Sequence, residues 1–182
     1  MSVTTWESVL TEPLSPDRDH VRGPADAALT MVEYGDYECP FCRAAVPEVE
    51  AVLQRAGDEL AYAYRHFPIT TAHPHALVAA EAAEAAGAQG RFWEMHQLLF
   101  ADQAHLEEAH LVARADALGL DVERFVGDLR RGAHSAKVQR DFLSGVRSGV
   151  NGTPTFFLNG RRHDGPFDAS SLLRSLAAAA RT

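Results

Sequence analysis

The chain has 182 residues, and 17 lysines and arginines against 25 aspartates and glutamates give it a net charge of −8. This length suits one domain, and 46% hydrophobic with 23% charged residues is ordinary for a globular protein, which argues against disorder and a fibrous architecture. The acidic balance argues against a sequence-independent grip on nucleic acid, because lysine and arginine supply that affinity. We therefore expect no nucleic-acid partner.

The start of the chain shows no targeting segment. Residues 1–12 lack the basic and apolar regions of a secretory signal, and no run approaches the roughly 18 apolar residues of a membrane span. The sequence therefore predicts a cytoplasmic protein without a membrane span, with an extracytoplasmic location left open if a leader was trimmed. Residues 1–26 are polar and contain three prolines, which predicts an irregular N-terminal arm.

A strand, a helix and a second strand are expected between residues 27 and 70. Residues 29–37 are short and rich in β-branched and aromatic side chains, which favours a strand. Residues 40–56 begin with a proline and carry apolar residues at helical spacing. Residues 60–67 form the second strand, so this half predicts a parallel, right-handed βαβ unit.

Residues 71–149 carry a helical pattern throughout, with breaks at several glycines. Within it, Pro74 is expected at the first position of a helix, where its missing N–H costs nothing. Residues 150–182 return to strands: 155–158, a two-residue Asn159-Gly160 turn, 161–163, and a last helix over 168–180 capped by Asp168. The sequence predicts an α/β mixed sheet whose two halves are separated by a helical insertion.

Both cysteines of the chain, Cys39 and Cys42, lie at the expected start of the helix that follows the first strand. Cysteines this close cannot staple a fold by closing a long loop, which excludes a disulfide framework. A helix N-terminus stabilises an anion, so the pKa of Cys39 should be lowered and Cys39 should be the nucleophile. Cys42 lies one turn further on, where it can resolve a mixed disulfide at Cys39.

Two other interpretations of the cysteine pair stay open. The spacing also suits half of a zinc site, which His66, His73 and His75 would have to complete because no other cysteine exists. We expect no metal there, and we expect His96 to be a packing residue. The remaining alternative is a pair of inert cysteines.

Three segments carry a resemblance to the DsbA-like branch of the thioredoxin superfamily: residues 33–42, 89–96 and 152–157. The match runs from about residue 20 to the C-terminus. The resemblance implies a thioredoxin fold with an all-helical insertion, a disulfide-exchanging activity without a cofactor, and a cis peptide bond before Pro154. It also implies that Cys39 is the nucleophile and Cys42 the resolving thiol.

Four further residues are expected to belong to the site. A cis turn at Pro154 would expose the backbone of Thr153 to an extended substrate chain, and Pro40 and Phe41 are expected substrate contacts beside the nucleophile. Glu33 lies on the same side of its strand as Met31, which points it beneath the active-site helix unless it faces solvent. By resemblance, such an acid exchanges the proton of Cys42, and burial would raise its pKa.

The aromatic and Met residues of 92–100 suit either a substrate groove or the core, and the helical spacing favours the core. The expected activity is thiol–disulfide exchange with protein or small-thiol substrates and with a redox partner. Two alternatives remain: a non-catalytic module that binds client chains near Pro154, and a glutathione-linked detoxification enzyme of the same fold. The sequence leaves redox direction, client and oligomeric state open.

Overall fold

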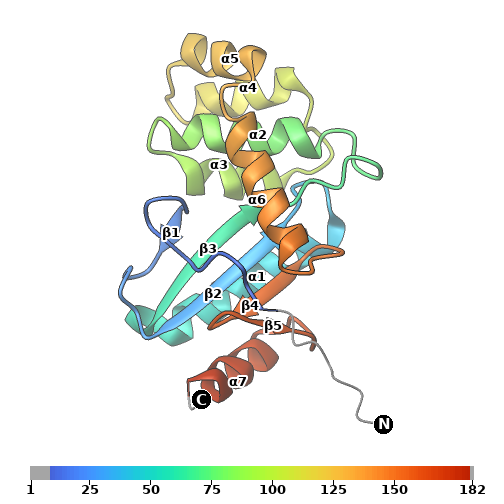
Figure 1. Cartoon of the computed structure of the whole chain (residues 1–182). Coiled ribbons are helices and arrows are strands. Elements are labelled where there is room, and N and C mark those ends of the chain that lie inside the picture. The colour runs from blue at the N-terminus through green and yellow to red at the C-terminus, as the bar shows by residue number, and fades with distance from the viewer. Residues whose placement is uncertain (1–8, 181–182) are drawn as a thin grey trace.

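A mixed five-stranded sheet forms the centre of the molecule, as Figure 1 shows. The computed structural model describes residues 9–180. The strands are β1 (Val21–Arg22), β2 (Leu29–Gly35), β3 (Leu60–His66), β4 (Thr155–Leu158) and β5 (Arg161–His163), in the order β1-β3-β2-β4-β5. Only β2 and β3 are parallel among these pairs. The expected mixed sheet whose two halves are separated by a helical insertion is confirmed.

Each face of the sheet has its own hydrophobic cluster, because side chains alternate along a strand. Met31, Tyr62 and Phe156 face α1 (Pro40–Ala56) and α7 (Ala169–Ala179), which pack against each other. Val32 and Phe157 point to the opposite face, which is covered by residues of the lead-in segment and by the C-terminal part of α6 (Ser135–Arg147). The candidate active site lies at the edge of the sheet where the elements that cover its two faces meet.

Local signals explain most element boundaries. Pro40 is the first residue of α1, as expected, and Asp168 accepts a hydrogen bond from the N–H of Ser171 at the start of α7. Asn159 and Gly160 both have positive φ (46° and 79°), which is the conformation a type I′ hairpin requires. β2 ends at Gly35, two residues before the expected end, because the chain turns there toward the cysteine pair.

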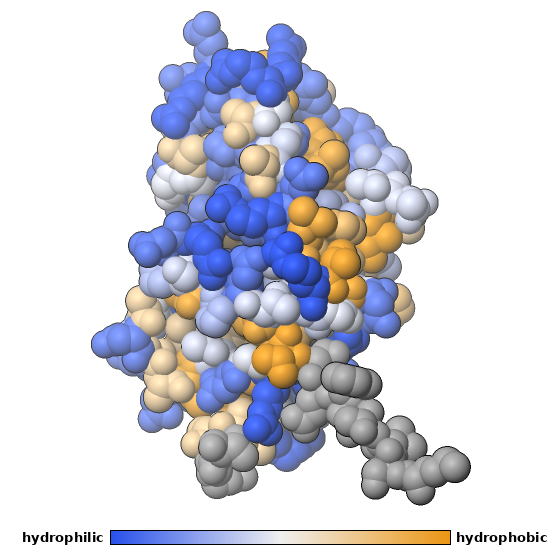
Figure 2. Space-filling view, in the orientation of Figure 1, coloured by the Kyte–Doolittle hydropathy of each residue, from blue (hydrophilic) through white to orange (hydrophobic). Residues whose placement is uncertain are grey.

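The helical insertion consists of α2 (Ala76–Gly87), α3 (Phe92–Ala101), α4 (Glu108–Ala117), α5 (Val122–Arg131) and α6. The prediction of Pro74 at a first helical position is wrong: Pro74 lies in a turn, and the helix begins at Ala76 after His75. Leu77, Leu143 and Val146 stay exposed on α2 and α6. Figure 2 shows hydrophobic atoms gathered over this side of the insertion.

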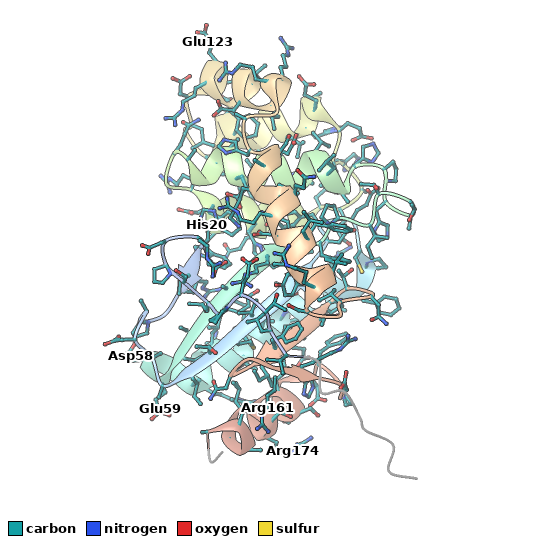
Figure 3. All side chains as sticks on the ribbon, in the orientation of Figure 1. His20, Asp58, Glu59, Glu123, Arg161 and Arg174 are labelled. Atoms are coloured by element: carbon teal, nitrogen blue, oxygen red, sulfur yellow. The ribbon has the colours of Figure 1, made fainter. Side chains whose placement is uncertain are left out.

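The segment before the sheet is more ordered than the expected irregular arm. Val21–Arg22 form β1, an edge strand antiparallel to β3, and Leu10 is buried against the sheet. The Asp19 carboxylate binds the Arg65 guanidinium through two hydrogen bonds of 2.9 Å, with both side chains almost fully buried. His20, labelled in Figure 3, stacks on Phe92 of α3 with ring centroids 3.7 Å apart. Of the expected arm 1–26, residues 1–8 lie outside the described residues.

Candidate active site

Cys39 occupies the position immediately before α1, where it is the N-cap residue with an extended backbone. Its Sγ lies 3.4 Å from the carbonyl oxygen of Thr153, which precedes Pro154. The Thr153–Pro154 peptide bond is cis, as the resemblance implied. The structure therefore brings together two segments more than 110 residues apart in the sequence.

The environment of Cys39 favours its thiolate. A hydrogen bond from the Cys42 thiol, the contact with Thr153, and the backbone N–H groups of Phe41 and Cys42 outweigh burial and lower the pKa of Cys39 to about 5. These N–H groups belong to the first turn of α1, whose donors have no partner within the helix. Cys39 is therefore a thiolate at neutral pH.

Cys42 has the opposite environment. Its side chain is fully buried, and its Sγ accepts a hydrogen bond from the N–H of Asp36 at 3.4 Å. Burial, followed by the effects of Cys39 and Glu33, raises the pKa of Cys42 well above its ordinary value. The two thiols of one motif thus differ in protonation, and Cys42 must lose a proton before it can attack a disulfide.

Glu33 lies in β2 and is only 3% exposed, which excludes the solvent-facing alternative. Its Oε2 accepts a hydrogen bond of 2.6 Å from the Tyr62 hydroxyl in β3. Burial raises the pKa of Glu33 to about 7, with the charge of Cys39 adding to the increase and the Tyr62 hydrogen bond opposing it. This carboxyl can accept or return a proton near neutral pH.

The loop before α2 is fastened to the cysteine loop by two pairs of an acid and a histidine. His73 Nδ1 lies 2.8 Å from Asp36 Oδ2, and His75 Nδ1 lies 3.1 Å from Glu38 Oε1. The N–H of Ile69 also donates to Asp36 at 2.8 Å. These histidines therefore serve the shape of the loop. Among the described residues neither is hydrogen-bonded to a cysteine, and His73 feels Cys39 only through its charge.

His66 is likewise occupied elsewhere, with Nε2 at 2.8 Å from Glu84 Oε1. Within residues 9–180, the one group of three side chains spaced to hold a metal ion is His66, Glu84 and Asp141, and neither cysteine belongs to it. The Lys137 ammonium lies 2.6 Å from Asp141 and 3.8 Å from Glu84, so a side-chain cation already occupies this cluster. The expected zinc alternative at the cysteine pair finds no support in this geometry.

The expected substrate contacts around Cys39 differ in exposure. Phe41 is 65% exposed and Pro40 is also exposed, whereas Thr153 and Pro154 are half-buried. Phe92, Met95 and Phe100 are buried and belong to the main hydrophobic cluster, so this stripe is core, as favoured. Phe100 also lines a shallow groove between α1 and α3, together with Arg43, Val46, Pro47 and Gln97.

Gln103 is a site residue that sequence reasoning missed. Its side-chain N–H₂ donates to the carbonyl oxygens of Tyr37 (2.8 Å) and Cys39 (2.9 Å), so the insertion holds the backbone on both sides of the cysteine loop. No spacing in the sequence links Gln103 to residues 64 and 66 positions earlier. Asp36 is a second residue that sequence reasoning missed. Its carboxylate binds three groups of two loops: the N–H groups of Glu38 and Ile69, and His73.

A cysteine pair at a helix N-terminus, a cis-proline beside it and a mixed sheet are the features of the thioredoxin class. A family model described as thioredoxin matches residues 15–178, and the chain belongs to this family. Among solved structures, BdbD from Bacillus subtilis in its oxidised form is similar with a TM-score of 0.83 at 21% identity, covering 97% of this chain and all of that one. A thioredoxin-like oxidoreductase from Silicibacter pomeroyi reaches 0.82 at 28% identity, covering 96% and 97%. The expected place in the thioredoxin superfamily is thereby confirmed, and the finer DsbA-like assignment stays a prediction.

The curated relatives carry a different name. The chain is 46% identical to a Na⁺/H⁺ antiporter NhaA 1 of Mycobacterium sp. (strain KMS), over 97% of this chain and 30% of that protein. A namesake from Salinispora arenicola is 50% identical, over 93% of this chain and 26% of the relative. The chain thus spans less than a third of these relatives. None of the helices among residues 9–180 is both long and apolar enough to cross a membrane.

Proposed function

We propose that the protein is a thiol–disulfide oxidoreductase that exchanges disulfides with protein substrates through a mixed disulfide at Cys39. The observation that carries the proposal is the unequal cysteine pair: Cys39 is poised as a thiolate at the start of α1, and Cys42 is buried and protonated beside it. Two chemically inert cysteines would not require such different pKa values. The antiporter name of the relatives is not used for this proposal, because the thioredoxin family match accounts for residues 15–178 of this chain.

In the reductive direction, the Cys39 thiolate attacks one sulfur of a client disulfide. A bond forms between Cys39 and the client sulfur, and the other client sulfur leaves as a thiolate that takes a proton from solvent. Cys42 then passes its proton to the Glu33 carboxylate and attacks Cys39, which forms the Cys39–Cys42 disulfide and expels the second client thiolate. The oxidative direction runs these steps in reverse, with the proton returning from Glu33 to Cys42.

The client chain is proposed to lie extended beside Thr153. The half-buried backbone of Thr153 lies next to Cys39. Strand-like pairing of the client with this backbone would therefore hold a client sulfur within reach of the nucleophile. The exposed Phe41 ring offers apolar contact on the other side.

The low pKa of Cys39 favours the oxidising direction. A pKa of about 5 in place of 9 stabilises the reduced form at pH 7 by about 3 kcal/mol, or roughly 60 mV for a two-electron couple. We therefore propose a couple more oxidising than one made of two ordinary thiols. The cytoplasmic location expected from the sequence would set this couple against a reducing thiol pool, so the measured potential decides which direction prevails.

The decisive experiment compares Cys39→Ser with Cys42→Ser in the reduction of insulin disulfides by dithiothreitol. We expect Cys39→Ser to abolish catalysis and Cys42→Ser to accumulate a mixed disulfide that a gel without reductant reveals. Catalysis that survives in Cys39→Ser would refute the proposal. If the wild type shows no catalysis and the two variants bind client chains as well as the wild type does, the non-catalytic binding module is supported instead.

A further inference from the structure

A small, partly enclosed cavity lies between the sheet, α1 and α3. Its volume is about 10 Å³, about the minimum that one water molecule needs. The lining combines polar and apolar side chains: Arg22, Glu33, Val46, Val49, Glu50, Tyr62, His96 and Phe100. A polar cavity of this size is suited to a single bound water, whereas a purely apolar one would stay dry.

Glu33 is the buried acid of this cavity, and one of its oxygens is free to face a water. Oε2 accepts from Tyr62, and Oε1 has no hydrogen-bond partner among residues 9–180. A protonated Glu33 therefore has no protein acceptor in direct reach of Oε1. After Cys42 has given up its proton, that proton needs a route from a site 3% exposed to solvent.

His96 lines the same cavity but is a poor acceptor. It is 7% exposed, and burial lowers its pKa to about 3. Its Nδ1 is already engaged with the Tyr37 hydroxyl at 3.0 Å. Val46, Val49 and Phe100 offer no acceptor at all, and they separate the cavity from the groove between α1 and α3.

The remaining polar wall is an ion pair that reaches the surface. Arg22 of β1 and Glu50 of α1 bind each other through both terminal nitrogens of the guanidinium, with Nη2 3.0 Å from Oε2. Their side chains are 30% and 34% exposed, so the pair touches both the cavity and solvent. Arg22 also lies over the Trp93 ring, 5.7 Å from its centroid, which holds the guanidinium in place.

We propose that the cavity and the Arg22–Glu50 pair form a one-water exit through which Glu33 exchanges the Cys42 proton with solvent. This inference rests on the proposed function. In each resolution step the proton leaves Cys42, resides on Glu33, passes to the cavity water and leaves at the Glu50 carboxylate, while the electron pair of the Cys42 sulfur forms the disulfide. Arg22 and Glu50 touch no substrate and act as positioning residues for this exchange.

The charged and titratable groups that face Glu33 come from four elements. They are Tyr62 and Tyr64 of β3, Arg22 of β1, Glu50 and Cys42 of α1, and His96 of α3, together with Cys39 and Tyr37 in the loop before α1. The intact ion pair adds no net charge to this set. Removing either partner would leave one charge beside the cavity, and the two removals act on Glu33 in opposite directions.

The first test fills the cavity without changing any polar group. Cys39 is loaded with thionitrobenzoate, and Cys42 is allowed to displace it in weak buffer. The yellow thionitrobenzoate anion reports the chemical step, and a pH-indicator dye reports the proton that reaches solvent. In the wild type both signals should rise together. In Val49→Ile the dye should lag the colour by roughly threefold or more in rate constant, because the proton must wait for local opening of the site.

The matched control is Val52→Ile, the same change on the same helix at a buried position outside the cavity lining. Its two signals should stay together. Val46→Ile fills the cavity from a second position if Val49→Ile does not fold. Coincident dye and colour in a folded cavity-filling variant would overturn the exit, and it would leave the proposed function standing because the colour alone reports the exchange.

The second test follows the Glu33 carboxyl by ¹³C NMR across pH. Arg22→Gln leaves the Glu50 charge behind and should raise the midpoint, whereas Glu50→Gln leaves the Arg22 charge and should lower it, each by about half a unit. If Arg22 and Glu50 had only a structural role, the two variants would not shift the titration midpoint of Glu33 in opposite directions. Shifts of the same sign, or none, would overturn the coupling between the pair and Glu33.

Discussion

Glu33 and Glu84 are both buried glutamates, yet their protonation is opposite. Glu33 has one neutral partner, the Tyr62 hydroxyl, and its pKa rises to about 7. Glu84 is hydrogen-bonded to His20 and His66 and lies near Lys137, and these partners outweigh burial and hold its pKa well below the ordinary range. Burial is the largest single influence on both, so the partners decide the outcome.

This difference separates a working group from a structural one. A carboxyl with one neutral partner can gain and lose a proton near neutral pH, which suits exchange beside Cys42. A carboxylate paired with two histidines and a lysine stays charged and joins the lead-in segment, β3, α2 and α6 through His20, His66 and Lys137. The comparison predicts that the two glutamates respond in opposite ways to pH and to neutralisation.

The largest expected effect is on stability in Glu84→Gln. The substitution leaves Lys137 and the histidines without their buried carboxylate, which should cost about 3–5 kcal/mol of unfolding free energy at neutral pH. Because the folded pKa is lowered, this stabilisation is present above the ordinary value of 4.5 and is lost as the pH falls below it. Urea unfolding at pH 7 and pH 4 measures both, with Glu81→Gln on the same helix as control. An equal loss at both pH values would contradict the assignment.

Glu33→Gln should have the reverse pH dependence. The folded pKa of about 7 exceeds the ordinary 4.5, so the wild type loses roughly 3 kcal/mol of stability as the pH rises between these values. The variant does not titrate, and should therefore become the more stable protein by about that amount above pH 7. Unfolding of both reduced proteins at pH 4.5 and 8.5 provides the measurement. The same variant should slow resolution by Cys42, and an unaltered pH profile of exchange would refute the proton role of Glu33.

Tyr62→Phe tests the single partner of Glu33 and should have the smallest effect. Loss of the hydroxyl removes the hydrogen bond that partly offsets the effect of burial on the pKa of Glu33. This pKa should therefore rise by about one further unit. The pH midpoint of exchange should move up with it, while the ring still fills its place in the core. Tyr64→Phe is the matched control, because the buried Tyr64 hydroxyl has no partner among the described residues. A midpoint that moves equally in both variants would show that Tyr62 has no special role.

Much of the site was predictable because its signals are local. Cys39 and Cys42 lie one helical turn apart, Pro40 marks the helix start, and the alternation of β2 places Glu33 with Met31. The Thr153–Pro154 pair needed the family resemblance, since nothing in its own segment points to residues more than 100 positions earlier. The roles of these residues stay predictions until the variants are measured, and so do the expected domain boundaries.

The parts that escaped prediction depend on contacts between distant segments. Gln103 reaches the cysteine loop from the end of α3, and Arg22 meets Glu50 across 28 positions. The polar composition of the lead-in segment suggested an irregular arm, because polarity alone does not reveal that Asp19 finds Arg65 in the interior. In each case a polar side chain has a partner that only the folded chain supplies.

The Asp19–Arg65 pair sets a practical limit on rearranging this domain. A shortened or fused protein that began after Asp19 would retain the Arg65 guanidinium, 2% exposed, with no carboxylate to balance it, and such an uncompensated charge destabilises strongly. A protein that began one residue later, after His20, would also lose the ring that stacks on Phe92. A junction with any other chain therefore belongs before Leu10, whose buried side chain is the first described anchor on the sheet.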